Sequence, residues 1–362
     1  MVFKFFRKFF SSEKSAEPVP ARDEHARASS ASTDDAYQRR LSNELKTFEN
    51  DEDVHDLPEI FHYWSNKYLR PKLEQYGIKH PEHFFFKYSD RRIGELERPA
   101  RLLSIGAGNC DMEARLAASL KNAGHHSFTI ECTDINQTML DRGAAHADEL
   151  GVSEHLKLSI CDFNSWQPDS KYDVIIANQC LHHVVELEHL FTAIHEAMNS
   201  ESLFLTSDMI GRNGHQRWPE ALELVQEFWK ELPQDYRRNR LLKRHEEQYV
   251  NHDCSSEGFE GIRAQDILPL LVERFKFELF LPFANVINVF IDRPFGGNFN
   301  AAADWDRGFI DRVHSADEEA MLAGKLKPTQ MLAVLRTEDF AASPGLWDQR
   351  MSPEQSVRPP SL

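Results

Sequence analysis

From residue 101 onward, short apolar runs alternate with longer stretches in which apolar residues recur at helical spacing. The runs are rich in Val, Ile and Leu and have no polar face, which is typical of strands covered on both faces of a parallel sheet. The longer stretches fit helices that cross back over such a sheet. The predicted strands are 102–105, 128–132, 156–160, 172–177 and 202–206, and the predicted helices are 111–121, 137–150 and 186–198.

Two further strands complete the predicted sheet after a long interruption. A mainly helical section covers residues 218–273, a strand-like apolar run covers 275–291, and a last strand covers 331–335. We therefore predict a doubly wound α/β domain over 101–338 with a mostly parallel, seven-stranded sheet. We expect 218–273 and 294–327 to be insertions at the functional edge of the sheet, where they would form a lid.

The segments on either side of this domain have different compositions. Residues 55–100 are rich in aromatic residues, and Phe61, Trp64 and Tyr68 fall at helical spacing, which predicts a helical extension packed on the domain. Residues 1–50 contain few large apolar residues beyond the first ten, so we expect a disordered tether. Residues 340–362 contain four prolines and are predicted to be a flexible tail.

Residues 1–10, MVFKFFRKFF, combine basic and aromatic residues. As a helix they would form a basic amphipathic tip, suited to weak contact with a membrane surface or a partner; a frayed terminus is the other interpretation. Basic residues interrupt the apolar stretch and no small-residue cleavage site follows, so we do not expect a secretion signal. Any membrane contact would then be peripheral, at the inner membrane surface.

Composition narrows the class of protein. Lys and Arg number 42 and Asp and Glu 58, so 42 − 58 gives a net charge of −16, which argues against nucleic acid as a partner. No apolar run approaches the ~18 residues that cross a bilayer, so we expect a soluble protein. The five cysteines form no CxxC pair and no metal-like spacing. We therefore predict a cytoplasmic protein without a metal site.

The loops that follow the predicted strands carry the candidate chemistry, because ligands bind at the carboxyl ends of parallel strands. Gly106 and Gly108 follow the first strand and allow a tight turn against a ligand. Asp134 follows the second strand, where a carboxylate can accept hydrogen bonds from both hydroxyls of a ribose. A nucleoside-containing cofactor is favoured over a purely structural turn with a helix cap.

Four motifs in this order resemble those of the Rossmann-like, class I S-adenosylmethionine-dependent methyltransferases: LLSIGAGNCDMEARLA, ECTDIN, CDF and YDVIIANQCLHHV. The resemblance covers residues 101–209 well. It implies that Gly106 and Gly108 hold the methionine part of the cofactor and that Asp134 holds the ribose. It further implies that Asp162 and Phe163 approach the adenine.

By the same resemblance, Asn178 lies beside the transferring methyl group. Two positions depart from the family pattern, because many relatives have an acidic residue in place of Ser104 and a third glycine in place of Cys110. We expect Asp111 or Glu113 to compensate near the amino group of the methionine moiety.

Two other functions share parts of this pattern. A nicotinamide-dependent oxidoreductase would also use a glycine loop and an acid, but that acid lies about 20 residues beyond the glycines. Asp134 lies 28 residues beyond Gly106, since 134 − 106 is 28, and the third glycine is absent. A degenerate relative that binds the cofactor without turnover is the non-enzyme alternative, against which the intact loop and acid argue.

The loop after the fifth strand, 207–220, is predicted to meet the methyl acceptor. We expect Asp208 and Arg212 to orient a polar acceptor and His215 to accept its proton; capping of the next helix is the other role considered for His215. Of His182 and His183, one is expected to pack and one to point into the pocket, and His182 is taken as a catalytic candidate. The predicted acceptor is a small molecule, a glycan or a lipid-linked intermediate, and no oligomeric state is predicted.

Overall fold

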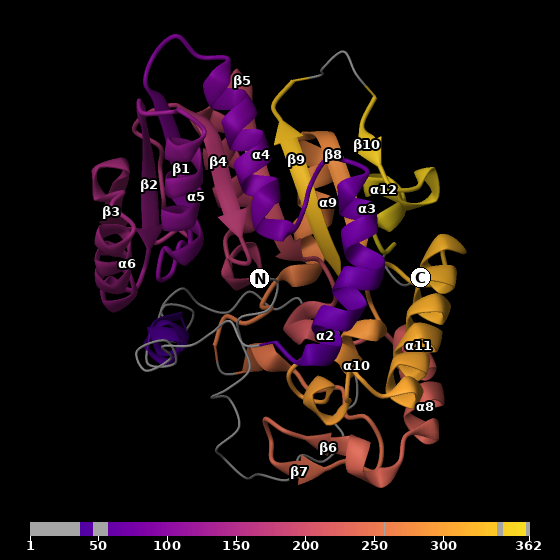
Figure 1. The fold of residues 1–362 in the computed structure, drawn as a ribbon. Helices are drawn as coiled ribbons and strands as arrows, with labels where there is room; N and C mark the ends of the chain where they lie inside the picture. Colours follow the sequence, from indigo (N-terminus) through magenta and orange to yellow (C-terminus); the bar gives the residue numbers. More distant parts are fainter. Residues whose placement is uncertain (1–36, 46–56, 257, 339–342, 360–362) are drawn as a thin grey trace.

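The computed structural model describes residues 37–45, 57–256, 258–338 and 343–359, and its centre is one large sheet (Figure 1). The strands lie in the order β10-β8-β9-β5-β4-β1-β2-β3, and neighbours are parallel except where β9 pairs. The sheet therefore has eight strands, not the seven predicted. Their bounds are β1 Ala100–Ile105, β2 Phe128–Asp134, β3 Leu156–Ile160, β4 Tyr172–Asn178, β5 Met198–Met209, β8 Lys276–Phe283, β9 Gln330–Arg336 and β10 Gly345–Leu346.

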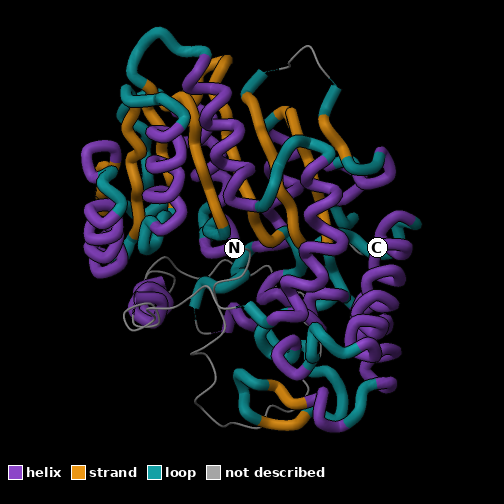
Figure 2. The backbone as a smooth tube through the Cα atoms, in the orientation of Figure 1, coloured by secondary structure: helices purple, strands orange, loops and turns teal. Residues whose placement is uncertain are grey.

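Helices cover both faces of this sheet, as the uniformly apolar strands predicted (Figure 2). Along β4, Val174 and Ile176 pack on the side of α4, α5 and α6, while Ile175 and Ala177 pack on the side of α7 and α9. The helices are α2 Glu59–Trp64, α3 Arg70–Glu74, α4 Pro81–Gly94, α5 Asp111–Asn122, α6 Gln137–Glu149, α7 Leu187–Ala197, α8 Pro219–Glu231, α9 Ala264–Arg274, α10 Ile287–Ile291, α11 Asp304–Leu322 and α12 Pro353–Ser356.

The aromatic-rich segment before β1 is helical. A π-helical turn, Ser65–Leu69, joins α2 to α3, and α4 follows. The indole N–H of Trp64 donates to Nδ1 of His314 on α11 at 3.2 Å, and Phe84 on α4 is fully buried. These aromatic side chains therefore pack α2 and α4 onto the rest of the fold.

The run 275–291 is not one strand. β8 ends at Phe283, Ala284 has a φ of 55°, and α10 begins three residues later. The carboxylate of Asp317, on α11, accepts hydrogen bonds from the backbone N–H groups of Asn285, Val286 and Ile287 at 2.9, 3.0 and 3.2 Å. This long-range cap starts a helix at a point where the apolar pattern continues unchanged.

Both predicted flexible ends contain regular structure. Residues 37–45, within the predicted tether, form a helix, and residues 343–359, within the predicted tail, contain β10 and α12. Tyr76 donates a hydrogen bond from its hydroxyl to the carbonyl of Leu346 at 2.5 Å, which ties β10 to the segment after α3. The predicted basic tip, residues 1–10, lies outside the described residues.

The insertions after β5 form the lower part of the molecule in Figure 1, with α8, α10, α11 and the short hairpin of β6 Arg238–Asn239 and β7 Arg244–His245. Section 218–273 is thus only partly helical. In the part of the chain that the structure describes, no helix combines the length and apolar character needed to cross a membrane.

Candidate active site

A cavity lies at the carboxyl ends of β1, β2 and β4, and every residue predicted to bind the cofactor lines it: Gly106, Gly108, Asp134, Asp162, Phe163 and Asn178. Apolar side chains form much of its remaining wall: Leu45, Leu57, Ile105, Met112, Met139, Val184 and Phe259. We call it the first cavity. Its position, where β1 and β4 are neighbours and the chain order reverses, is the switch point of a doubly wound sheet.

The backbone of the first loop requires glycine. Gly106 and Gly108 have φ values of +60° and +56°, a conformation that side chains disfavour. A Cβ on Gly106 would lie 2.6 Å from the Cβ of Cys180. Cys110, at the position where many relatives have a third glycine, has a φ of 51° and precedes α5. A cysteine therefore adopts here the left-handed conformation that favours glycine.

Asp134 connects the second strand to this loop. Its Oδ2 accepts a hydrogen bond from the N–H of Gly108 at 2.9 Å, and its Oδ1 accepts one from the N–H of Asn136 at 2.9 Å. Burial raises the pKa of the Asp134 carboxyl, and the two N–H groups oppose that rise. The carboxylate thus holds the glycine loop while it lines the first cavity.

Glu113 contacts Ser104 and brings to the first cavity the acidic side chain that Ser104 lacks. The hydroxyl of Ser104 donates to Oε1 of Glu113 at 2.6 Å, and Glu113 is 3% exposed. Of the two acids expected to compensate, Glu113 lines the first cavity and Asp111 is not among its lining residues.

Helix 37–45 covers one side of the first cavity, a contact that the sequence analysis did not predict. The hydroxyl of Tyr37 donates to Oδ2 of Asp162 at 2.7 Å, and Oε1 of Glu44 lies 2.8 Å from Nδ1 of His183. Tyr37, Leu41 and Glu44 fall at helical spacing, the one local signal from which this helix could have been predicted.

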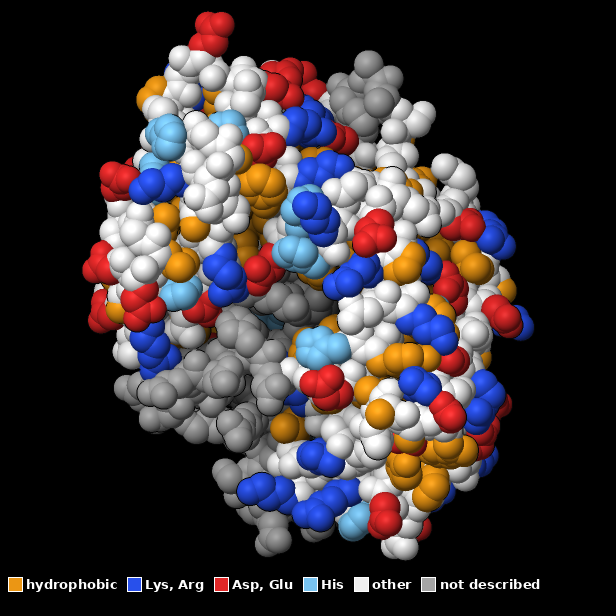
Figure 3. All heavy atoms as spheres, in the orientation of Figure 1, with side chains coloured by type: hydrophobic (Ala, Val, Ile, Leu, Met, Phe, Trp, Pro, Cys, Tyr) orange, Lys and Arg blue, Asp and Glu red, His pale blue; other side chains and the backbone are white. Residues whose placement is uncertain are grey.

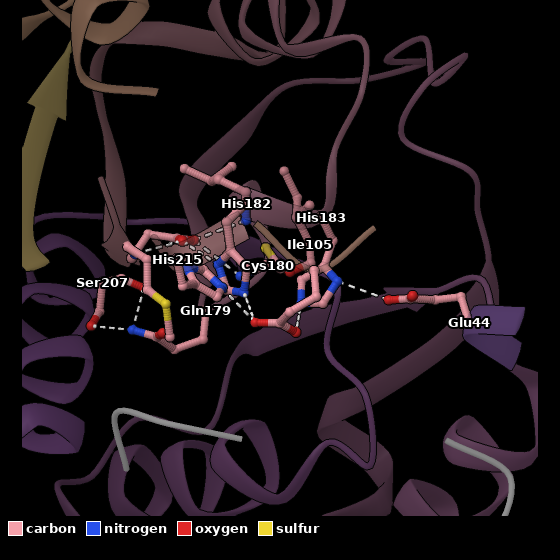
Figure 4. Close-up of polar contacts among 12 residues, drawn as sticks. Glu44, Ile105, Gln179, Cys180, His182, His183, Ser207 and His215 are labelled. Carbon is pink, nitrogen blue, oxygen red and sulfur yellow. Dashed lines mark hydrogen bonds and ion pairs between the residues drawn. The ribbon is translucent and has the colours of Figure 1, made fainter. Parts of the chain in front are cut away.

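Three histidines gather around one buried carboxylate beside the first cavity (Figure 4). Nε2 of His215 lies 2.5 Å from Oε1 of Glu260, and Nε2 of His182 lies 3.5 Å from the same oxygen. Nε2 of His183 lies 3.5 Å from the other oxygen, Oε2. Glu260 is 1% exposed and belongs to the insertion, where no motif marks it. We call these four residues the His–Glu cluster.

Asp208, expected to orient the acceptor, lies behind the cluster and lines neither cavity. Its Oδ1 lies 2.6 Å from Nδ1 of His182, and its Oδ2 accepts from the N–H groups of Cys180 and Leu181 at 3.0 and 2.8 Å. Asp208 is 0% exposed. The guanidinium of Arg212 donates to the carbonyl of Arg217 at 3.2 Å, within its own loop. Asp208 is therefore placed to orient His182.

Three of the four residues in the His–Glu cluster have shifted pKa values: His215, His182 and Glu260. Burial lowers the pKa of His215, and Glu260 opposes that effect. Burial also disfavours the charged form of His182, but Asp208 and Glu260 outweigh it and raise its pKa to about 10. Burial would raise the pKa of Glu260, yet the neighbouring histidines lower it well below the ordinary range.

A second cavity lies below the carboxyl end of β5, among the insertions. His215 lines it, together with Arg217, Tyr249 and Asp292. His183 and Glu44 line the first cavity, so the His–Glu cluster separates the two cavities. His182, the residue of the adjacent pair taken as the catalytic candidate, is 1% exposed and lines neither cavity, whereas His183 lines the first cavity.

Comparison with known proteins agrees with this geometry. A family model described as a methyltransferase domain matches residues 96–270, which include the glycine loop, Asp134 and the His–Glu cluster. Residues 96–270 are thus similar to a methyltransferase domain. The domain is 27% identical over 145 residues to the ubiquinone/menaquinone biosynthesis C-methyltransferase UbiE of Vibrio cholerae, covering 39% of this chain and 52% of that protein. The chain thus spans about half the length of the curated relatives it matches.

Solved structures similar to the methyltransferase domain share little sequence with it. One is the O-methyltransferase from a trans-AT polyketide synthase of Brevibacillus brevis with S-adenosylhomocysteine, with 13% identity, a TM-score of 0.43, and coverage of 79% of this chain and 85% of that one. Another is a methyltransferase from Thiobacillus denitrificans with the same ligand, with 14% identity, a TM-score of 0.39, and coverage of 78% and 100%.

Proposed function

We propose that this protein transfers a methyl group from S-adenosylmethionine to a small-molecule nucleophile, with the donor in the first cavity and the acceptor in the second. The observation that carries the proposal is that all six residues assigned to the cofactor line one cavity of a methyltransferase domain. The reaction class is in-line displacement at the methyl carbon.

The residues of the first cavity fit an adenosyl cofactor. The glycine loop exposes backbone where a Cβ would clash, the Asp134 carboxylate suits a ribose, and Phe163 and Met139 offer apolar surface to a base. Glu113 suits the positive amino group of the methionine moiety. When bound, the cofactor supplies a methyl group already activated on a sulfonium.

On the acceptor side, His215 faces the second cavity and is backed by Glu260. We assign His215 the removal of the acceptor's proton, with Glu260 holding its ring. His182 and Asp208 act as positioning residues for the turn that follows β4. Positioning of the two reactants can lower the activation barrier by roughly 7–11 kcal/mol. A general base typically raises the rate by only about 10²–10⁴-fold. The alignment of the two cavities is therefore the larger contribution.

The second cavity favours a small acceptor with both polar and apolar parts. Leu241, Val289 and Phe295 supply apolar wall, and Arg217 supplies a guanidinium that suits an anionic or carbonyl group. We retain a small molecule as the acceptor class, in preference to the glycan and lipid-linked acceptors also expected from the sequence.

Turnover with a labelled methyl donor tests this function. Ligands extracted from the purified protein and candidate acceptors would be incubated with the protein and the donor. We expect His215→Ala to lower turnover by about 10²–10⁴-fold without changing cofactor affinity, and His195→Ala, an exposed control on α7, to keep full activity.

The other outcomes separate the alternatives. Full activity of His215→Ala would remove His215 from the mechanism. Tight binding of S-adenosylhomocysteine without turnover on any acceptor would favour the degenerate binding module, and protection by a nicotinamide dinucleotide instead would favour the oxidoreductase.

A further inference from the structure

The His–Glu cluster brings one nitrogen or oxygen atom from each of His182, His215 and Glu260 within 4.8 Å of one another. We propose that these three side chains bind a divalent transition-metal ion of the zinc type, with His183 as a fourth donor. The spacing of 33 and 45 residues between the three ligands, from 215 − 182 and 260 − 215, gives no sequence motif, which is why the absence of a metal was predicted.

Carboxylates orient two of the imidazoles in the way that metal ligands require. Nδ1 of His182 lies 2.6 Å from Asp208, and Nδ1 of His183 lies 2.8 Å from Glu44. A carboxylate at Nδ1 fixes the proton there and leaves Nε2 as the donor atom, as in carboxylate–histidine–zinc arrangements. In both residues Nε2 is the atom that faces Glu260.

Unsatisfied polar atoms at the centre of the cluster point independently to a ligand. Nε2 of His182 and Oε2 of Glu260 are buried and make no hydrogen bond, although their residues are each 1% exposed. Buried polar atoms are almost always hydrogen-bonded, because a missing partner is costly. A cation among these atoms would satisfy both.

The charges of the cluster favour a cation. Glu44, Asp208 and Glu260 place three buried carboxyl groups against three imidazoles. Without a metal, protons on the imidazoles must balance this charge. With a metal, the ion balances it and the imidazoles remain neutral donors.

The donor set selects the class of metal. Two or three imidazoles and one carboxylate suit zinc, cobalt or ferrous iron, whereas magnesium and calcium prefer oxygen ligands alone. Catalytic zinc sites use three protein ligands and keep one position open. Because the cluster separates the two cavities, an ion here would lie beside an acceptor in the second cavity; this role, but not the binding itself, rests on the proposed function. His215 therefore acts as the base of the proposed function only in the metal-free protein, because its side chain is a ligand when the ion is bound.

Metal binding by the full chain tests the proposal directly. The protein, without an affinity tag that binds metal, is stripped with a chelator and titrated with Zn²⁺ and with Co²⁺. Bound zinc is measured by elemental (inductively coupled plasma) mass spectrometry, and bound cobalt by its visible absorption. We expect one ion per chain and the intense absorption of low-coordinate Co²⁺, and we expect Glu260→Gln and His215→Asn to lower the affinity at least about 100-fold.

Two further variants separate a ligand role from a structural one. Asp208→Asn should weaken binding by about 10–100-fold because it disturbs the contact that orients His182, and His195→Ala should bind as the original protein does. The proposal is overturned if the original chain binds no stoichiometric metal, if its Co²⁺ complex lacks the low-coordinate absorption, or if folded Glu260→Gln keeps its affinity. S-adenosylhomocysteine binding is measured on the same samples. If the protein binds this cofactor product but no metal, the metal site is overturned and the proposed function is not.

Discussion

Gly106 shows why the first loop of the site can be predicted from sequence. Its φ of +60° follows from a tight turn between a strand and a helix, which is local in the chain, whereas its approach to Cys180, after β4, comes from the fold. Gly108 and Asp134 belong to similarly local turns. The motif therefore carries enough information to place these residues in one cavity.

The rest of the site could not be predicted from the sequence, as three of its residues show: Glu260, Glu44 and Tyr37. Each contacts a residue far along the chain: Glu44 meets His183 and Tyr37 meets Asp162, across sequence separations of 139 and 125 residues. A contact between residues so far apart in the chain produces no recognisable spacing in the sequence. Asp208 is a similar case, because only the fold shows that its Oδ2 accepts hydrogen bonds from the turn after β4.

At the residue scale, we expect Gly106→Ala to destabilise the protein by about 1–3 kcal/mol, because a Cβ would be strained at positive φ and would clash with Cys180. Gly308→Ala is the matched control, since nothing lies within 4 Å of its added Cβ and it lies within α11. That change should stabilise by about 0.5–1 kcal/mol. Urea unfolding measures both; equal stability of the two variants would contradict the assigned loop conformation.

At the scale of elements, the alternation of strands and helices from β1 to β5 follows from periodicity, and the predicted bounds are close to those observed. The start of α10 does not follow from periodicity, because the side chain of Asp317, on α11, caps it. β10 is only two residues long and pairs with β8, so it lacks any periodic signal. Short elements fixed by distant partners are the ones that sequence patterns missed.

Glu318 on α11 forms an acid-sensitive pair of contacts, one within α11 and one to α3. Glu318 contacts Nε2 of His314 at 3.0 Å and the ammonium of Lys72. The hydrogen bond from His314, aided by Lys72 and opposed by burial, lowers the pKa of Glu318 from 4.5 to about 2. Because the folded pKa lies below the unfolded value, this stabilisation is present above pH 4.5 and is lost as the pH falls toward 2.

We therefore expect Glu318→Gln to lower the free energy of unfolding by about 1–2 kcal/mol at neutral pH. The difference from the original protein should shrink as the pH falls from 4.5 toward 2. Urea midpoints across this range provide the measurement, with the exposed Glu319→Gln as control. A difference that stays constant with pH would show that the link is not electrostatic.

At the scale of the whole molecule, the insertions and helix 37–45 surround the carboxyl edge of the sheet, where the two cavities lie. Figure 3 shows charged side chains of both signs interspersed over one face of the molecule, and the large exposed apolar residues are scattered, as with Ile160, Val250 and Trp305. The net charge of −16 is thus not concentrated into a single-sign patch on that face.

Calorimetric titration of the purified protein with S-adenosylhomocysteine tests the central claim most directly. We expect one binding site per chain, with binding lost in Asp134→Ala because the variant lacks the carboxylate that meets the ribose and holds Gly108. Asp141→Ala, an exposed change on α6, should bind normally. No heat from the original protein, or equal affinity in Asp134→Ala, would contradict the assignment of the first cavity to this cofactor.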